Sequence, residues 1–146
     1  METEVKKITA SETRKLRQLI LRPHQRAEEL IYEDDEHPDT VHFGAFIGNE
    51  LEGIASLYKH IPDGIEVKDS WRLRGMATSE KFRGRGLGLL LMNRCIEHSK
   101  KMNGKIFWCN ARTTAEGFYE KFGLKRIGEV FTPEGLGEHI VMIKKL

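Results

Sequence analysis

A chain of 146 residues, 39% hydrophobic and 32% charged, is long enough to bury its own core and too apolar to be disordered. We therefore expect one domain over residues 1–146. The longest strongly apolar run, Leu87 to Met92, is far shorter than the roughly 20 residues of a membrane span, and the N-terminus lacks the apolar segment of a signal peptide. Two cysteines, Cys95 and Cys109, exclude a disulfide scaffold, so we expect a cytoplasmic protein without membrane partners.

The net charge of +2 is unevenly distributed along the chain. Residues 1–65 contain 8 Lys and Arg against 13 Asp and Glu, whereas residues 66–146 contain 16 against 9. Two interpretations are open. The charges form solvated faces, or the second half binds a polyanionic ligand and the first half attracts a cationic one.

In the first half, the pattern predicts a strand, a helix, a short second helix within residues 24–40, and a hairpin. We expect the first helix to begin at an N-cap on Ser11 and to end near Arg22, because Pro23 disfavours helical geometry in the residue before it. The turn Gly48-Asn49-Glu50 joins the two strands of the hairpin. The three strands are expected at residues 4–8, 41–47 and 51–59.

In the second half, strands and helices alternate before a final pair of strands. A strand at 71–78 precedes a glycine-rich turn, and a helix then runs to about residue 101. A buried strand at 105–110, a helix at 113–122 and strands at 124–131 and 139–143 complete the chain. In the strand at 71–78, simple alternation places Trp71, Leu73, Gly75 and Ala77 on one face and Arg72, Arg74, Met76 and Thr78 on the other. This order predicts a mixed α/β fold with helices on both faces of the sheet.

The strongest local signal is the turn Phe82-Arg83-Gly84-Arg85-Gly86-Leu87-Gly88, which lies between a strand and a helix. Glycines let the backbone approach a ligand, and the free amides at the start of a helix favour phosphate. The spacing is one residue too short for the dinucleotide fingerprint and lacks the Gly-Lys-Ser/Thr of a P-loop. A glycine-rich turn without a ligand is the alternative.

The pattern Arg83-x-x-Gly86-x-Gly88 resembles the acetyl-CoA signature of the GNAT N-acetyltransferase superfamily. It follows a strand that ends Met76-Ala77-Thr78, and it precedes Ala115-x-x-Phe118-Tyr119-Glu120-Lys121-Phe122-Gly123-Leu124, which is similar to the family's A-x-x-F-Y-x-x-x-G-F segment. The order of elements also matches, so the resemblance covers essentially the whole chain. It implies a mixed, mostly antiparallel sheet with a splay between strands 4 and 5.

The resemblance further implies where acetyl-CoA, the acyl donor, binds. The pantetheine arm would lie along Met76, Ala77 and Thr78, with the amide of Met76 donating to the thioester carbonyl. The pyrophosphate would rest on the amides of Arg85, Gly86, Leu87 and Gly88, and Arg83 and Gly84 would shape the turn. Family members often have Asn three residues before the helix alanine. Here Arg112 takes that place, so Asn110 becomes the candidate for the pantetheine contact. Arg112 could instead bind a substrate carboxylate or a CoA phosphate.

By the same resemblance, Tyr119 would protonate the departing CoA thiolate; packing of its ring is the alternative role. The general base is not identified by a motif. The candidates are Glu33, Asp34, His42, Glu52 and His139, of which His139 is favoured because it lies in the C-terminal region that closes many acceptor sites in the family. Cys109 as a covalent nucleophile is disfavoured, because an apolar strand raises the pKa of a thiol.

The expected function is therefore acyl-CoA-dependent N-acetyl transfer to a small-molecule or peptide amine by direct attack. A non-catalytic acyl-CoA-binding or regulatory module is the alternative. Nucleic acid is not expected as a partner, because aromatic interleaving and a helix-turn-helix pattern are missing. The histidines and cysteines have no metal-ligand spacing, so no metal is expected. The oligomeric state stays open, a homodimer included.

Overall fold

The computed structural model describes residues 2–146, which divide into two compact units. Unit 1 comprises residues 2–58 and Leu73–His98; unit 2 comprises Lys59–Arg72 and Ser99–Leu146. The two units are described separately below. No helix within residues 2–146 is long and apolar enough to cross a membrane.

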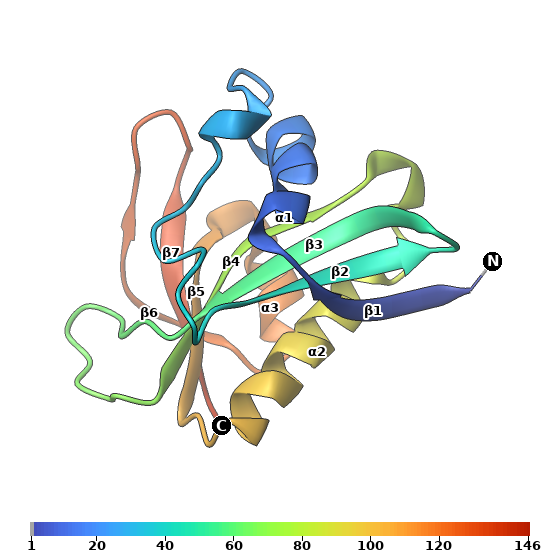
Figure 1. Cartoon of the computed structure of the whole chain (residues 1–146). Helices are drawn as coiled ribbons and strands as arrows, with labels where there is room; N and C mark the ends of the chain where they lie inside the picture. The colour runs from blue at the N-terminus through green and yellow to red at the C-terminus, as the bar shows by residue number, and fades with distance from the viewer. Residues whose placement is uncertain (1) are drawn as a thin grey trace. The chain divides into compact units, whose positions relative to one another are not determined.

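Unit 1 contains the N-terminal strands and the two longer helical segments (Figure 1). Its strands follow the spatial order β1-β2-β3-β4, and the β1–β2 and β2–β3 pairs are antiparallel. The strand predictions are confirmed to within one residue. The elements are β1 (Thr3–Ile8), α1 (Ala10–Leu16), π-helix η1 (Arg17–Leu21), 3-10 helix η2 (Ala27–Glu29), β2 (Val41–Ile47), β3 (Glu50–Tyr58), β4 (Ser70–Thr78), 3-10 helix η3 (Glu80–Phe82) and α2 (Leu87–Lys101), of which β4 and α2 each extend into unit 2.

Helices α1 and α2 cover opposite faces of the strands in unit 1 (Figure 1). On the α1 face, Leu16 of the helix packs with Ile54 and Ala77 of the strands. On the α2 face, a Cβ built on Gly53 would lie 3.1 Å from the Leu91 side chain. Because Gly53 and Ile54 are consecutive residues of one strand, they point to opposite faces. The prediction of helices on both faces is therefore confirmed.

The first helix differs from the prediction at its N-terminus, whereas its helical segment ends at Leu21, with Arg22 as C-cap, as predicted. Its N-cap is Thr9, not Ser11, and Thr9 forms a capping box with Glu12. After Leu16 the helix widens into the π-helix η1, closed by a bond from the Arg22 amide to the Arg17 carbonyl at 3.0 Å. π-Helical turns often mark positions with a special side-chain requirement. Here that position is Arg17, whose side chain is fully buried.

Arg17 is the centre of a buried polar network that hydropathy alone does not predict. Its two terminal nitrogens bind both carboxylate oxygens of Asp35, at 2.7 and 3.0 Å, and also contact Ser56, Tyr58 and the Leu30 carbonyl. Burial alone would raise the pKa of Asp35, but hydrogen bonds from Arg17, Tyr58 and the Tyr32 amide outweigh it, so the pKa is lowered. The network ties the segment after η2 to η1 and β3.

An Asp35→Asn variant is expected to lose about 3–5 kcal/mol of unfolding free energy, because it leaves the buried Arg17 charge uncompensated. A lowered pKa means that the carboxylate's contribution is fully present above the ordinary Asp pKa of about 3.9 and is lost as pH falls through the folded-state value. Urea unfolding at neutral pH and near pH 3 measures both effects.

The matched control is Glu29→Gln, which removes an exposed carboxylate that pairs with Arg26 at 3.0 Å. We expect it to cost under about 1 kcal/mol. Equal losses in the two variants would show that the Arg17–Asp35 pair does not stabilise the fold.

Unit 2 contains the C-terminal strands, in the order β5-β7-β6 with both pairs antiparallel. The elements are β5 (Ile106–Arg112), 3-10 helix η4 (Thr113–Ala115), α3 (Glu116–Glu120), β6 (Lys125–Phe131) and β7 (His139–Lys145). The single helix predicted at 113–122 is in fact a 3-10 turn followed by a short α-helix. With helices among mostly antiparallel strands in both units, the predicted mixed α/β class is confirmed. The splay between strands 4 and 5 stays a prediction.

Candidate active site

The start of the glycine-rich turn is fixed to β3 by Glu52. The amide of Ser79 donates to the Glu52 carbonyl at 2.8 Å, and the Ser79 hydroxyl donates to its carboxylate at 2.9 Å. Lys81 lies 3.4 Å from the other carboxylate oxygen. Glu52, a candidate general base in the sequence, is therefore a buried anchor whose carboxylate already has two partners.

The turn itself depends on glycine. Gly84 and Gly86 have φ of +79° and +81°, a conformation that costs other residues roughly 1–2 kcal/mol. A Cβ built on either glycine would meet no atom within 4 Å, so space is open above both. Arg83 and Arg85 on either side are exposed. The turn thus combines a closely approachable backbone with two cationic side chains.

The turn leads directly into α2, a helix of 15 residues. The Gly86 carbonyl accepts the first helical hydrogen bond, from the Leu90 amide at 3.1 Å. The amide of Arg85 already donates to the Phe82 carbonyl. The expectation that this amide is a free donor for the pyrophosphate is therefore wrong. Within the part of the chain that the structure describes, the amides of Gly86, Leu87, Gly88 and Leu89 have no such partner. Four such donors at the positive end of a long helix dipole are suited to bind an anion.

At the end of β4, Ala77 belongs to the core on the α1 face, whereas the Thr78 methyl lies 3.5 Å from a Cβ built on Gly53, on the α2 face. The alternation of side chains predicted for this strand fails earlier, at Arg74 and Gly75. The Arg74 guanidinium lies 4.0 Å from the Tyr32 ring centroid, and a Cβ on Gly75 would lie 3.2 Å from the same ring. Consecutive residues that face one ring indicate a bulge, and Gly75 has φ of +66°. Met76 follows this bulge immediately.

In unit 2, the half-buried Tyr119 packs edge-on against Phe118, with ring centroids 5.2 Å apart. Its pKa is raised, mainly by burial and further by the neighbouring Cys109, while Arg112 acts in the opposite direction. The phenol therefore keeps its proton at neutral pH. A protonated hydroxyl beside a cation is suited to donate to a developing thiolate.

Cys109 is a buried, free thiol whose pKa is raised by burial to about 12. Such a thiol is fully protonated at neutral pH, and a thiolate is the nucleophilic form. This agrees with the expectation that Cys109 forms no acyl intermediate.

His139 lies directly opposite Arg112 in the β5–β7 register and opposite Phe131 in the β6–β7 register. Its Nδ1 lies 3.0 Å from the Gly137 carbonyl. A carbonyl only accepts, so Nδ1 carries the proton and the lone pair of Nε2 is left to accept one. Asn110 is exposed two residues before Arg112 on β5, where its side chain shares a face with Arg112.

The remaining base candidates lie in the first unit. His42 is buried, and its two ring nitrogens contact Ser56 at 2.7 Å and the Asp35 carbonyl at 2.9 Å. Glu33 and Asp34 are exposed. Asp35 belongs to the buried Arg17 network, so the acidic segment offers fewer surface carboxylates than its sequence suggests. Of the histidines considered, His139 is the one with an available lone pair.

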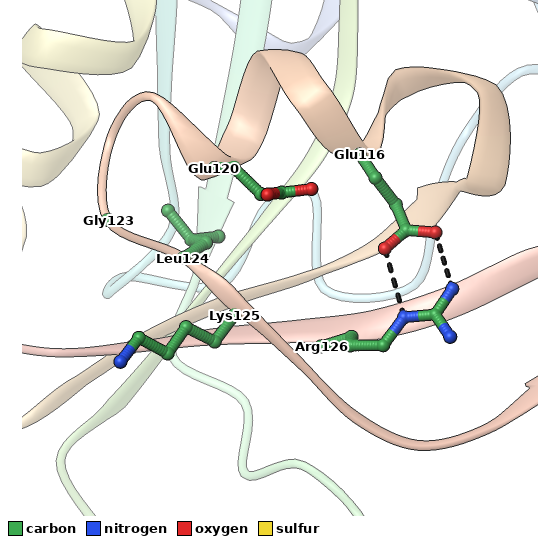
Figure 2. A pocket seen from close by; sticks show the side chains of 6 residues that line it. All are labelled: Glu116, Glu120, Gly123, Leu124, Lys125 and Arg126. Carbon is green, nitrogen blue, oxygen red and sulfur yellow. Dashed lines mark hydrogen bonds and ion pairs between the residues drawn. The ribbon is translucent and has the colours of Figure 1, made fainter.

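An open pocket of about 420 Å³ lies between α3 and β6, within unit 2. Figure 2 shows the Arg126 guanidinium bound to both carboxylate oxygens of Glu116, at 2.6 and 3.0 Å. The pocket is lined by Glu116, Glu120, Gly123, Leu124, Lys125 and Arg126. None of the site residues predicted from the sequence lines this pocket, so it is not the expected cofactor site. Residues 2–146 contain no cluster of His, Cys, Asp or Glu side chains suited to a metal.

Comparisons with known proteins address the family of the chain. An acetyltransferase (GNAT) domain model matches residues 15–146. The uncharacterized N-acetyltransferase YitI of Bacillus subtilis is 40% identical over 144 residues, which cover 98% of this chain and 96% of that protein.

Two solved structures share the fold. Escherichia coli ElaA has a TM-score of 0.79 at 22% identity, covering 98% of this chain and 99% of that chain. An aminoglycoside 6'-N-acetyltransferase complexed with coenzyme A has a TM-score of 0.76 at 19% identity, covering 97% and 96%. The family model and the identity to YitI together show that the chain belongs to the GNAT acetyltransferase family.

Proposed function

We propose that the protein is an N-acetyltransferase that moves an acetyl group from acetyl-CoA to a primary amine by direct attack. The observation that carries the proposal is the turn at the start of α2. Four amides without a partner in residues 2–146 stand at Gly86 to Leu89, and Gly84 and Gly86 leave open space beside them. The CoA pyrophosphate would bind these amides, with Arg83 and Arg85 supplying positive charge.

The proposed chemistry assigns one role to each residue. The neutral amine attacks the thioester carbon, a C–N bond forms and the C–S bond breaks. The amide of Met76, which follows the bulge at Gly75, donates to the carbonyl oxygen as negative charge develops. Tyr119 gives its proton to the departing thiolate, and Nε2 of His139 takes the proton that the attacking nitrogen loses. Asn110 contacts the pantetheine arm.

The experiment is an acceptor screen. Protein and acetyl-CoA are incubated with amines, amino acids and short peptides, and free CoA thiol is measured. We expect thiol release that depends on one class of acceptor, together with a product heavier by one acetyl group in mass spectrometry. Acetyl-CoA binding in calorimetry without release for any acceptor would favour a non-catalytic acyl-CoA-binding module. Absence of both binding and release would contradict the proposal.

A further inference from the structure

The side chain of Tyr32 lies between two arginines in unit 1. The guanidinium carbons of Arg17 and Arg74 are 3.9 and 4.0 Å from the centroid of its ring. Two cationic groups cannot occupy the same position over one face, so they lie on opposite faces of the ring. Each cation–π contact contributes roughly 0.5–2 kcal/mol, and together they hold Arg74 in one place.

The two arginines differ in how their charge is balanced. Arg17 is fully buried, and Asp35 binds it with both carboxylate oxygens. Arg74 is half-buried, and no carboxylate within residues 2–146 lies within 4.0 Å of its guanidinium. A partly desolvated cation without a counter-charge gains most from an anion that arrives with a ligand.

Arg74 also stands next to the expected reaction centre. The Arg74 side chain lies beside the Tyr32 ring, directly before the bulge at Gly75, and Met76, the proposed donor to the thioester carbonyl, directly follows the bulge. Only Gly75 separates Arg74 from Met76 in the chain. One small acceptor can therefore present an anionic group to the Arg74 side chain and a nucleophile near the Met76 amide.

We propose that Arg74, held by Tyr32, binds a carboxylate of the acceptor, so that the substrates are amines that also carry a carboxylate, such as amino acids. The inference rests on the proposed N-acetyl transfer. A guanidinium whose carbon lies over a ring keeps the N–H groups at its edge, and these match the two oxygens of a carboxylate. Arg74 thereby selects the acceptor and orients its amine.

The test compares matched acceptors: L-amino acids and their carboxamides, which keep the amine and remove the negative charge. In the unaltered protein, kcat/KM is expected to favour the amino acid. The preference is the kcat/KM of the amino acid divided by the kcat/KM of its carboxamide. In Arg74→Gln this ratio is expected to fall by roughly ten- to a hundredfold, the effect of losing hydrogen bonds to a charged group. Arg74→Lys keeps the charge but lacks the paired N–H groups of the guanidinium, so its ratio is expected to lie between those of the unaltered protein and Arg74→Gln.

Two controls isolate the arrangement. Arg26→Gln removes the same charge from an arginine whose side chain is 78% exposed and that pairs with glutamates in its own segment, and it should leave the ratio unchanged. Tyr32→Phe keeps the ring and should keep the preference, whereas Tyr32→Ala should weaken it. Circular dichroism of each variant verifies folding.

The outcomes separate this inference from the proposed function. If the protein acetylates amines but treats the two acceptors alike, or if Arg74→Gln lowers both rates equally, Arg74 does not bind a carboxylate and the inference is overturned. If the unaltered protein neither binds acetyl-CoA nor releases CoA, the proposed function fails, and the inference falls with it.

Discussion

A Gly86→Glu variant is expected to lose CoA binding while keeping its fold. A Cβ at this position meets no atom within 4 Å, so the new side chain enters the open space before α2 without a clash. Its carboxylate would occupy the free amides and oppose the phosphates, and like charges in contact cost several kcal/mol, a loss of roughly a hundredfold or more in affinity. Isothermal titration calorimetry with CoA measures the effect.

The matched control for this variant is Gly64→Glu. Gly64 has φ of +77°, and a Cβ there also meets nothing within 4 Å, so it shares the backbone strain and the added charge. It belongs to a loop of unit 2 far along the sequence from the turn. We expect unchanged CoA affinity in Gly64→Glu. Unchanged affinity in Gly86→Glu as well would mean that the pyrophosphate does not bind this turn.

The second large effect is expected from Tyr119→Phe, which keeps the ring and removes the hydroxyl. General acid catalysis contributes about 10²–10⁴-fold, so kcat should fall by that range. Because the aromatic ring still packs against Phe118, the fold and the affinity for acetyl-CoA should be retained. Stopped-flow measurement of thiol release in a single turnover would isolate the chemical step from product release.

The pH dependence gives an independent check on Tyr119. Its pKa is raised above the ordinary value of about 10, so the phenol stays protonated, and able to donate, throughout the neutral and moderately alkaline range. We therefore expect no decline of kcat from loss of this proton up to about pH 10. A drop in kcat of less than about threefold in Tyr119→Phe would assign the tyrosine to packing alone.

The part of the site that could be predicted from the sequence is the part made by the backbone. The turn at residues 84–88 depends on glycines that follow one another in the chain, and positive φ at Gly84 and Gly86 is what such a sequence permits. The side-chain part was harder to predict. Simple alternation places Arg74 and Gly75 on opposite faces of the strand, whereas in the structure both lie beside the Tyr32 ring.

The same contrast holds for the acidic segment. Seven carboxylates between residues 28 and 39 suggested a surface that attracts cations. Asp35 is instead buried against Arg17, which lies 18 positions earlier. Neutralising Asp35 would therefore damage the fold and not merely the electrostatic field. Nothing in the local sequence distinguishes Asp35 from Asp34, because the distinction is made by a residue on another element.

The sequence by itself determined the type and order of the elements, the α/β class and the glycine-rich turn, because apolar periodicity and glycine backbone freedom are local properties. The tertiary structure alone decided which charged groups are paired. It buries Arg17 with Asp35, uses Glu52 as an anchor for Ser79, and leaves Arg74 without a carboxylate within 4.0 Å among residues 2–146. The physical reason is that a charge is stabilised by whichever partner packing brings within about 4 Å, and sequence separation carries no information about that distance.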